Sequence, residues 1–357
     1  EILKALYRDV DLLVLDEPTA VLTDAEVAGL FEIIHKLTAD KKSVIFISHK
    51  MKEVMEISDR ITILRSGKSV RTVKKENTTE EELTNLMVGR KLQEQLVEKS
   101  MDQKEDVLKL EKVSFHRQNK HNGLNDISLE VKKGQIVGVA GVDGNGQSQL
   151  ALLASGNLVP ESGEVYINGE KIKHFTPDTF IRKKVSHIPE DRNRMGLVGD
   201  MTIAENLILK ETDGERFSYG RGLYLRKDKI RTYAQKMQQE NDIRCLNMDQ
   251  AVRSLSGGNQ QKVILARELQ SKPDFLIAMH PTRGLDIGAS EFVHEQMLQE
   301  KKRGCGILLI SANLDEIIKL ADVIVVMFEG KIMGTFPGIN PPIDKISMAM
   351  TGRGETA

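Results

Sequence analysis

The chain opens on an apolar block that predicts a strand, and a helical pattern follows it. Residues 10–15 are apolar apart from Asp11 and lead into Asp16 and Glu17, which is typical of a strand buried on both faces of a parallel sheet. The tetrapeptide from Thr23 to Glu26 has the form of a capping box and predicts the start of a helix. One face of that helix would be apolar, at Val27, Leu30, Phe31, Ile34 and Leu37.

Strand and helix patterns continue to alternate along the chain, which indicates a parallel α/β sheet. In the opening segment, residues 44–47 and 61–64 predict strands, and a helix runs through Val54 between them. Later strand patterns form a β-rich lobe at 107–115, 127–131 and 164–167, and extend the sheet at 136–140, 307–310 and 323–326. Residues 200–255 carry helical patterns around the polar stretch 211–222, so we expect a helical insert there.

An internal repeat relates the first 68 residues to a later part of the chain at a constant offset of 263 positions. Residues 14–19, Val-Leu-Asp-Glu-Pro-Thr, correspond to residues 277–282, Ile-Ala-Met-His-Pro-Thr. Ser48 corresponds to Ser311 without any gap. A period of this length indicates duplicated domains rather than a solenoid, whose repeats span about 20–50 residues.

The repeat predicts two domains of one kind, joined by a linker. We assign residues 1–89 to the first domain and residues 107–351 to the second. Residues 90–106 are rich in charge and weakly periodic, and we assign them to the linker. If the two domains are of similar length, about 150–160 residues of the first would precede Glu1. We therefore expect the chain to open partway through its first domain.

Composition narrows the class of protein. Apolar residues make up 40%, enough for packed cores, and the net charge of −1 argues against a general nucleic-acid binder, which would usually carry a basic face. No apolar run approaches the roughly 18–20 residues that span a bilayer, and no secretory signal is visible. Cys245 and Cys305 lack metal-ligand spacing, so we expect two reduced thiols in a cytosolic protein.

A glycine-rich loop between a predicted strand and a predicted helix is the first candidate for binding phosphate. It fits the pattern G-x-x-x-x-G-K-[ST] except that Gln147, which carries no charge, replaces the Lys. Glycines let backbone N–H groups converge on phosphate oxygens, and the hydroxyl of Ser148 would bind a metal ion. A tight turn with a purely structural role is the alternative. The candidate residues are Gly141, Asp143, Gly144, Asn145, Gly146, Gln147, Ser148 and Gln149.

The most specific motif is Leu-Ser-Gly-Gly-Asn-Gln-Gln-Lys at 255–262, which resembles the signature of ATP-binding-cassette (ABC) ATPases. A Ser and two glycines before a helix predicted at 263–270 would present backbone amides and the helix dipole to an anion. In this family the motif closes over the γ-phosphate of ATP held by the opposite cassette. A plain Gly-Gly helix cap is the alternative. The candidate residues are Ser256, Gly257, Gly258, Asn259 and Gln260.

Asp16 and Glu17 are the candidate catalytic carboxylates. In a nucleotide site the first would bind Mg²⁺, and the second would orient or deprotonate the attacking water. His49, which follows a predicted strand, would act at the γ-phosphate as the switch histidine of such ATPases. The alternatives are an Asp-Glu pair that only caps a helix and a histidine with a structural role.

The second copy lacks these groups. Met279 and His280 stand where the first copy has its two carboxylates, and Ala312 replaces the histidine. Loss of a general base alone typically lowers a rate by ~10²–10⁴, and this copy also lacks the metal carboxylate and the Lys. We therefore expect it to hold nucleotide without hydrolysing it, with action of His280 as a base as the alternative. Asp286 keeps the form of the family's D-loop.

Together these motifs resemble the tandem ATPase subunit of bacterial importers for simple sugars and nucleosides. The sequences Val-Asp-Gly-Asn-Gly-Gln at 142–147 and Ala-Val-Leu-Thr at 20–23 resemble the nucleoside branch more than the ribose branch. The resemblance implies two ABC-type P-loop cassettes, each with a parallel-sheet core, a β-rich lobe and a helical subdomain, the first only partly present. The cassettes would pair within one chain and sandwich two ATP molecules. The productive site would combine the first cassette's phosphate loop, Asp16, Glu17 and His49 with the second cassette's signature.

The resemblance also implies partners and a place of action. ATP binding and hydrolysis would drive two membrane permease subunits, which receive solute from an extracytoplasmic binding protein. The protein would lie peripherally on the cytoplasmic face of a bacterial cell membrane and bind no nucleic acid. Glu190 stands where most ABC ATPases have the Q-loop Gln. Residues 1–357 alone are expected to be inactive, because the first phosphate loop is absent.

Two other functions are considered beside the importer. One is a soluble tandem cassette that acts on ribosomes or nucleic acid, and the other is a nucleotide sensor without a role in transport. Soluble tandem cassettes usually keep both catalytic sites and join them with a basic helical linker. Here the second site lacks the catalytic groups, and residues 90–106 contain charges of both signs, which favours the importer.

Overall fold

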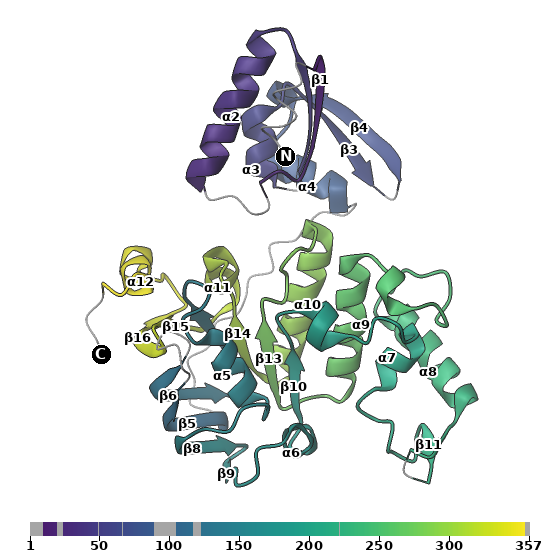
Figure 1. Cartoon of the computed structure of the whole chain (residues 1–357), viewed down its shortest axis with the longest axis vertical. Coiled ribbons are helices and arrows are strands. Elements are labelled where there is room, and N and C mark those ends of the chain that lie inside the picture. The colour runs from purple at the N-terminus through teal and green to yellow at the C-terminus, as the bar shows by residue number, and fades with distance from the viewer. Residues whose placement is uncertain are drawn as a thin grey trace. The chain divides into compact units, whose positions relative to one another are not determined.

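The computed structural model describes residues 10–19, 24–48, 50–65, 67–88, 105–116, 123–220 and 222–353. The chain divides into two compact units, one made chiefly of residues 1–95 and the other chiefly of residues 96–357 (Figure 1). Each unit has apolar cores of its own. Among the described residues, every helix is too short or too polar to cross a bilayer.

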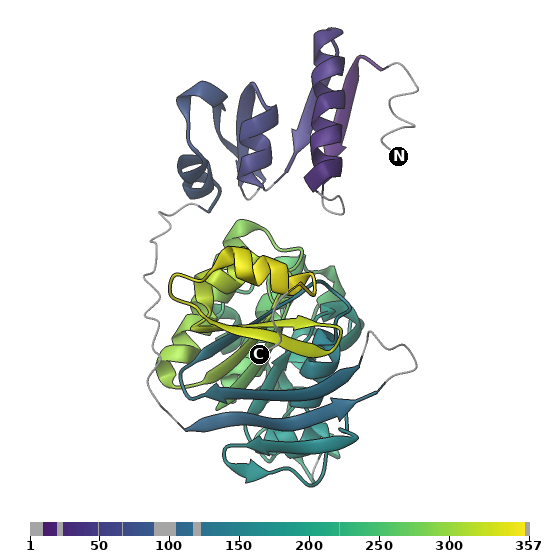
Figure 2. The same cartoon turned by 90° about the vertical axis from the view of Figure 1, so that its left-hand side faces the viewer.

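The first unit contains two separate two-stranded sheets. One pairs β1 (Leu12–Asp16) and β2 (Ser43–Ile47) in parallel, and the other pairs β3 (Arg60–Arg65) and β4 (Lys68–Lys74) antiparallel. Among the described residues of this unit, the helices are α2 (Asp24–Ala39), α3 (Met51–Ile57) and α4 (Glu80–Val88), with a 3-10 turn η1 at Lys75–Asn77. The predicted apolar face of α2 is confirmed, since it packs on the buried side of β1 and β2 (Figures 1 and 2). Thr23, which opens the predicted capping box, lies outside the described residues.

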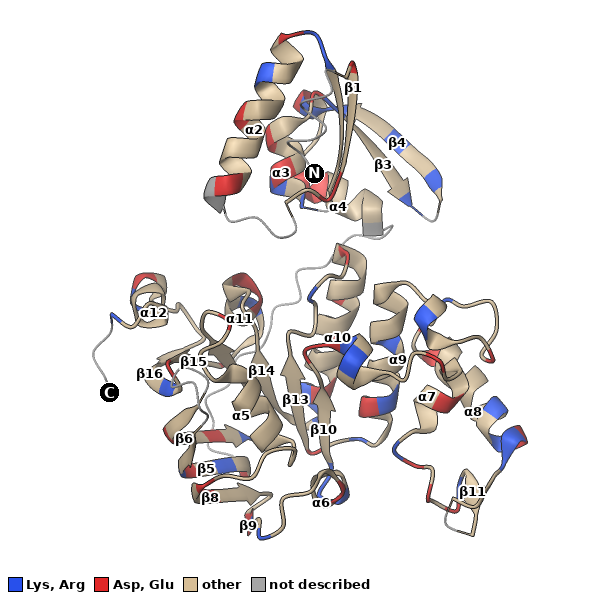
Figure 3. Cartoon of the chain, in the orientation of Figure 1, with Lys and Arg blue, Asp and Glu red and all other residues tan. Residues whose placement is uncertain are grey.

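The second unit is built on a six-stranded sheet with the order β10-β13-β14-β7-β15-β16, in which only the last strand is antiparallel to its neighbour. The strands are β7 (Ile136–Ala140), β10 (Val185–Ile188), β13 (Phe275–Met279), β14 (Gly306–Ile310), β15 (Val323–Phe328) and β16 (Lys331–Pro337). All but β16 lack Asp, Glu, Lys and Arg, so they appear uniformly tan in Figure 3. An antiparallel sheet of β6 (Leu124–Lys132), β5 (Asp106–Phe115), β8 (Ser162–Ile167) and β9 (Glu170–Lys171) forms the expected β-rich lobe.

Helices cover both faces of this sheet and form the helical segment beside it (Figure 1). They are α5 (Gln147–Ala154), α6 (Pro177–Arg182), η3 (Arg192–Gly196), α7 (Ile203–Ile208), α8 (Lys227–Glu240), η4 (Val252–Ser254), α9 (Gly257–Gln270), α10 (Ile287–Arg303), α11 (Leu314–Leu320) and α12 (Ile343–Met350). Within the predicted helical insert, the polar stretch also forms a short hairpin of β11 (Ser218–Tyr219) and β12 (Tyr224–Leu225). Helix α9 begins at Gly257, earlier than predicted, because the extended Ser256 is its N-cap and the glycines form its first turn.

The two units repeat the same structure at the offset found in the sequence. Adding 263 to the bounds of β1, β2, α3, β3 and β4 gives the bounds of β13, β14, α11, β15 and β16. Even the irregularity between Ile63 and Leu64 recurs between Val326 and Met327. The predicted repeat is therefore confirmed as a structural one.

One strand and one covering layer distinguish the two copies. In the second unit β7 lies between β14 and β15 and joins them into one sheet. No described residue of the first unit supplies such a strand between β2 and β3, so its two sheets remain separate.

The prediction that the first strand is buried on both faces is wrong for the same reason. Leu12 and Val14 are 51% and 55% exposed, whereas their counterparts Phe275 and Ile277 are fully buried. In the second unit the β-rich lobe and α5 cover that face of the sheet. The described residues of the first unit contain no equivalent layer.

Candidate functional site

The candidate carboxylates of the first unit lie at the carboxyl end of a parallel strand. Asp16 ends β1 and Glu17 follows it, and both residues are exposed. Glu17 has a left-handed backbone with φ of 44°, and its N–H donates to the carbonyl of Ile47 at 2.9 Å. A non-glycine residue in this conformation costs about 1–2 kcal/mol and persists only where its surroundings enforce it.

A buried carboxylate, Glu53, ties the ends of β1 and β2 together. The hydroxyls of Thr19 and Ser48 donate to its Oε2 at 2.7 and 3.1 Å, and Lys50 forms an ion pair with its Oε1 at 2.9 Å. Sequence analysis missed this residue, although the repeat could have pointed to it as the counterpart of Glu316. His49, the third candidate catalytic residue, lies outside the described residues.

In the second unit, the glycine-rich loop connects β7 to α5 as predicted. Gly144 and Gly146 have φ of 91° and 99°, which favours glycine at both positions. Any Cβ at Gly146 would also lie 2.7 Å from the carbonyl of Gly123. Asn145 fixes the loop to the β15–β16 turn, where its side-chain oxygen accepts from the N–H of Glu329 at 2.9 Å. The loop is thus held in one conformation by its own surroundings.

Gln147 turns back into this loop instead of pointing out of it. Its Nε2 donates to the carbonyl of Val142 at 2.9 Å, and its Oε1 accepts from the N–H of Asn145 at 2.9 Å. The residue is 5% exposed. The amide oxygen therefore uses a backbone N–H of the kind that would bind a phosphate oxygen. The substitution removes a positive charge and also fills part of the loop.

The remaining polar groups of the second site bind one another. Arg283 forms an ion pair with Glu190 at 3.2 Å and lies 3.8 Å from Asp143. Ser148 donates its hydroxyl to the other oxygen of Glu190 at 3.2 Å. Asp143 also lies 3.5 Å from Nε2 of His280. The structure thus brings together the predicted site residues Asp143, Ser148 and Glu190 with His280, and adds Arg283 to them.

His280 is held in a way that does not suit a general base. Its Nδ1 accepts from the N–H of Ala312 at 3.3 Å, so a neutral ring carries its proton on Nε2, which faces Asp143. Neither nitrogen is then open to take a proton from water. Met279 beside it is 4% exposed and offers no oxygen ligand.

The donor set of the second site suits phosphate better than metal. The backbone amides of a glycine-rich loop and the start of α5 suit an anion, although the side chain of Gln147 occupies the N–H of Asn145. A magnesium ion prefers carboxylates and would find apolar Met279 at the strand end. Within the described ranges, no cluster of three His, Cys, Asp or Glu residues is arranged to hold a metal ion.

The signature residues come together at the start of α9. Ser256 is the N-cap, and Asn259 donates to its hydroxyl at 2.9 Å while accepting from the N–H of Arg244 at 2.8 Å. A Cβ at Gly257 would lie 2.8 Å from the guanidinium of Arg192, so a larger residue there would require the Arg192 side chain to shift. The other members, Gly258 and Gln260, lie in the first turn of the helix, and Asp286 directly precedes α10.

A buried network around Glu316 repeats the one around Glu53. Glu316 accepts hydrogen bonds from Thr282 at 2.8 Å and Ser311 at 2.6 Å. Its positive partner is His294, whose Nε2 lies 2.9 Å away. Burial alone would lower the pKa of His294, but its interactions with Glu291 and Glu316 raise it. Burial opposes the charge on Glu316 as well, and the hydrogen bonds from His294, Ser311 and Thr282 lower its pKa.

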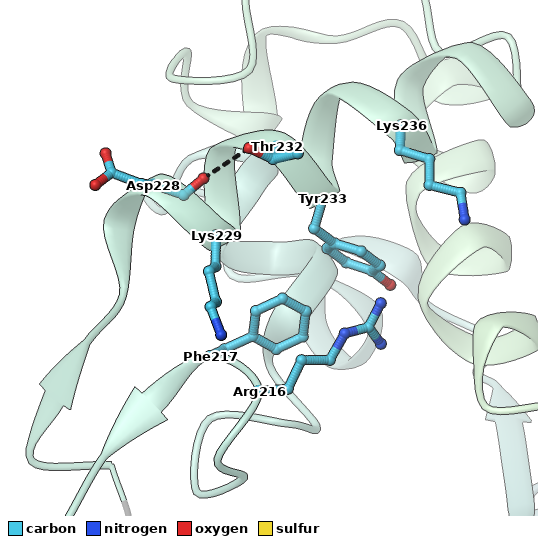
Figure 4. A pocket seen from close by; sticks show the side chains of 7 residues that line it. All are labelled: Arg216, Phe217, Asp228, Lys229, Thr232, Tyr233 and Lys236. Carbon is cyan, nitrogen blue, oxygen red and sulfur yellow. Dashed lines mark hydrogen bonds between the residues drawn. The ribbon is translucent and has the colours of Figure 1, made fainter.

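A cavity of about 420 Å³ lies beside α8, away from all of these residues (Figure 4). Its floor is made of Phe217 and Tyr233, and the guanidinium of Arg216 covers both rings at 4.7 and 4.6 Å. Arg216 is paired with Glu211, and Lys236 at the rim is paired with Glu240. Because the rings are covered and these two cations have partners, we assign the cavity no ligand.

Residues 124–283 match the family model described as ABC transporter. The chain is 41% identical over 354 residues to the nucleoside import ATP-binding protein NupA of Lactococcus lactis, covering 99% of this chain and 69% of that protein. The chain belongs to the ABC family of sugar and nucleoside import ATP-binding proteins. It is also 41% identical to the glucose import ATP-binding protein TsgD13 of Haloferax volcanii, over 99% of this chain and 64% of that protein. The guanosine import ATP-binding protein NupO of Bacillus subtilis is 42% identical, over 96% of this chain and 66% of that protein.

The chain thus spans about two thirds of the length of these relatives of the ABC family. Solved cassettes support the fold alone. One ATP-binding cassette of an ABC transporter aligns with a TM-score of 0.58 at 22% identity, covering 70% of this chain and 98% of that one. A nucleotide-free cassette aligns with a TM-score of 0.55, also at 22% identity, covering 65% of this chain and 92% of that one. The predicted α/β ABC cassette fold is confirmed.

Proposed function

We propose that this chain is part of the ATP-binding subunit of an importer for a nucleoside or a simple sugar. The subunit would couple ATP binding and hydrolysis to transport through two membrane permease subunits. It would lie on the cytoplasmic face of the membrane, where a solute-binding protein on the opposite side delivers the solute to the permease. The names of the relatives, which include glucose, nucleoside and guanosine import, support this class of substrate.

One observation carries the proposal: two units repeat one structure, and only the first keeps a pair of carboxylates at the end of its strand. Glu17 and His280 occupy equivalent positions, with φ of 44° and 45°. In the first unit the side chain there is an exposed carboxylate, next to Asp16. In the second it is a histidine whose two nitrogens face Ala312 and Asp143. We infer one hydrolytic site and one site that binds nucleotide without turnover.

The division of the chain follows from the same comparison. We propose that residues 1–89 are the C-terminal part of a first cassette, that residues 90–106 link it to the second, and that residues 107–351 form the second cassette. The bare face of β1 and β2 supports this division, because its counterpart in the second unit is covered by the lobe and α5. A first cassette of full length would supply the strand equivalent to β7 and the first phosphate loop.

The two candidate metal ligands, Asp16 and Ser148, belong to different sites. Asp16 would bind Mg²⁺ beside the first phosphate loop, with Glu17 orienting the attacking water and His49 contacting the γ-phosphate. The signature of the second cassette, from Ser256 to Gln260, would close over that phosphate. In the other site, the loop from Gly141 to Gln149 would hold ATP, where Ser148 is the remaining candidate metal ligand and Asp286 belongs to the D-loop.

The test is steady-state ATP hydrolysis by the complete subunit reconstituted with its permease. Glu17→Gln should abolish turnover, because it removes the proposed base while keeping the shape of the side chain. His280→Ala should barely alter turnover, because the second site is proposed to be inactive. Hydrolysis that survives Glu17→Gln but is lost in His280→Ala would reverse the assignment. Binding to ribosomes instead of permease-containing vesicles would point to a soluble tandem cassette.

A further inference from the structure

Glu53 joins the two segments of the first unit that carry its proposed catalytic groups. Its single oxygen Oε2 accepts hydrogen bonds from both Thr19 and Ser48. Thr19 lies two residues after Glu17, and Ser48 directly precedes His49 in the sequence. We propose that Glu53 is a positioning residue for ATP hydrolysis, an inference that rests on the proposed function.

The bridge is buried, which makes it costly to break. Glu53 and Thr19 are 9% and 2% exposed. A buried carboxylate is stable only when it is paired and hydrogen-bonded. Lys50 supplies the pairing charge at 2.9 Å and also donates to the carbonyl of Thr19 at 3.3 Å. Removing the carboxylate would leave the buried hydroxyl of Thr19, the half-buried hydroxyl of Ser48 and a cation without their shared partner.

The backbone at Glu17 gives the bridge a specific task. A left-handed residue other than glycine relaxes unless both of its flanks are held. On the N-terminal side, the N–H of Glu17 donates to the carbonyl of Ile47 at 2.9 Å. On the C-terminal side, Thr19 donates to Glu53 at 2.7 Å and its carbonyl accepts from Lys50 at 3.3 Å. We infer that the bridge keeps the Glu17 carboxylate aimed at one place relative to the end of β2.

The second unit contains the same bridge with a different cation. Glu316 accepts from Thr282 on Oε1 and from Ser311 on Oε2, whereas Glu53 accepts from both Thr19 and Ser48 on Oε2. The cation beside Glu316 is His294 instead of a lysine. The cation comes from a different position in each unit. The first unit has Phe31 at the position of His294, and the second has Asn313 at the position of Lys50. What the units share is therefore the hydroxyl-to-hydroxyl bridge, which sets the shape of the strand ends. In the first unit alone, those ends carry the proposed catalytic groups.

This pairing provides a matched control. In the complete subunit with its permease, Glu53→Gln should lower kcat for ATP on the order of 10–100-fold, the usual effect of a misplaced catalytic group, with KM little changed. Glu316→Gln makes the same change in the second unit and should leave kcat unaltered. Thr19→Val, which removes the donor but keeps the shape, should lower kcat as well, and Thr19→Ser should restore it.

The outcomes separate this inference from the proposed function. If Glu17→Gln abolishes hydrolysis but Glu53→Gln and Thr19→Val retain the wild-type kcat, the positioning role is wrong and the proposed function stands. If Glu17→Gln itself retains hydrolysis, the proposed function is wrong. Equal losses of kcat in Glu53→Gln and Glu316→Gln, together with equal losses of thermal stability, would reduce the bridge to a structural feature and overturn the inference. Should Glu53→Gln fail to fold, Thr19→Val and Thr19→Ser still decide the question.

Discussion

Glu17 and His280 adopt the same left-handed backbone, with φ of 44° and 45°, and each donates its N–H to the carbonyl of the last residue of the neighbouring strand, at 2.9 and 2.8 Å. The two side chains differ in chemistry, yet the strained conformation is common to both. The position is therefore set by the architecture of the strand end. In the first unit that architecture presents a carboxylate, and in the second it presents an imidazole.

Glu17→Gly should stabilise the first unit while it removes the proposed base. Glycine tolerates the left-handed conformation, and the relief of about 1–2 kcal/mol is offset by its greater freedom in the unfolded chain, so a net gain of about 0.5–1 kcal/mol is expected. Urea denaturation of the purified chain measures the free energy of unfolding. Lys41→Gly is the matched control, because Lys41 has φ of 64° and its counterpart is already Gly304. A loss of stability at position 17 but not at 41 would contradict the strain argument.

The sequence predicted the phosphate loop and the signature because each is a short motif of neighbouring residues. It predicted the repeat and the contrast in carboxylates because a constant offset of 263 positions aligns two such motifs. It did not predict that Gln147 fills the loop, since the side chain's direction depends on where the carbonyl of Val142 and the N–H of Asn145 fall. It also missed Glu53 and Glu316. From sequence alone, a single Glu in a helix is predicted to be exposed. Only the fold brings hydroxyl groups from other segments of the chain to these two carboxylates.

The bare face of β1 predicts opposite responses to the same substitution. Val14 is 55% exposed and its counterpart Ile277 is fully buried. Val14→Lys should change the free energy of unfolding by less than about 0.5 kcal/mol, as surface substitutions usually do. Ile277→Lys would bury an unpaired charge and should prevent folding of the second unit. Circular dichroism during urea denaturation distinguishes the two, and equal tolerance at both positions would mean that the faces are covered alike.

The pair of His294 and Glu316 should make the stability of the second unit depend on pH. The pKa of His294 is raised above its ordinary value of 6.5, so its contribution is complete below about pH 6.5 and is lost as pH rises through the raised pKa. The pKa of Glu316 is lowered from 4.5, so its contribution is present above about pH 4.5 and is lost on further acidification. The pair should therefore stabilise most between these values, which denaturation at a series of pH values would detect.

The first unit suggests substitutions that would abolish the loss of stability of the second unit at high pH. His294→Phe combined with Asn313→Lys gives the second unit the arrangement of Phe31 and Lys50. Because a lysine stays charged to a much higher pH than a histidine, stability should no longer fall as pH rises above about 6.5. His294→Phe alone should be destabilised at all pH values above 4.5, since Glu316 would remain buried without a cation. An unchanged pH profile in the double variant would assign the dependence to other groups.

Gln147→Lys should strengthen nucleotide binding by the second unit without creating turnover. The change frees the N–H of Asn145 and adds a charge that can donate to phosphate, and charge-assisted hydrogen bonds contribute about 1.5–3 kcal/mol, or roughly tenfold or more in affinity. Titration of the chain with a fluorescent ATP analogue measures the dissociation constant.

Gln147→Leu separates the two effects, because it empties the loop but supplies no charge, and its affinity should lie between those of the wild type and the lysine variant. Hydrolysis should stay absent, since Met279 still offers no metal ligand and the Nε2 of His280 still faces Asp143. A lysine variant that binds no more tightly than the wild type would show that the loop does not receive phosphate at all.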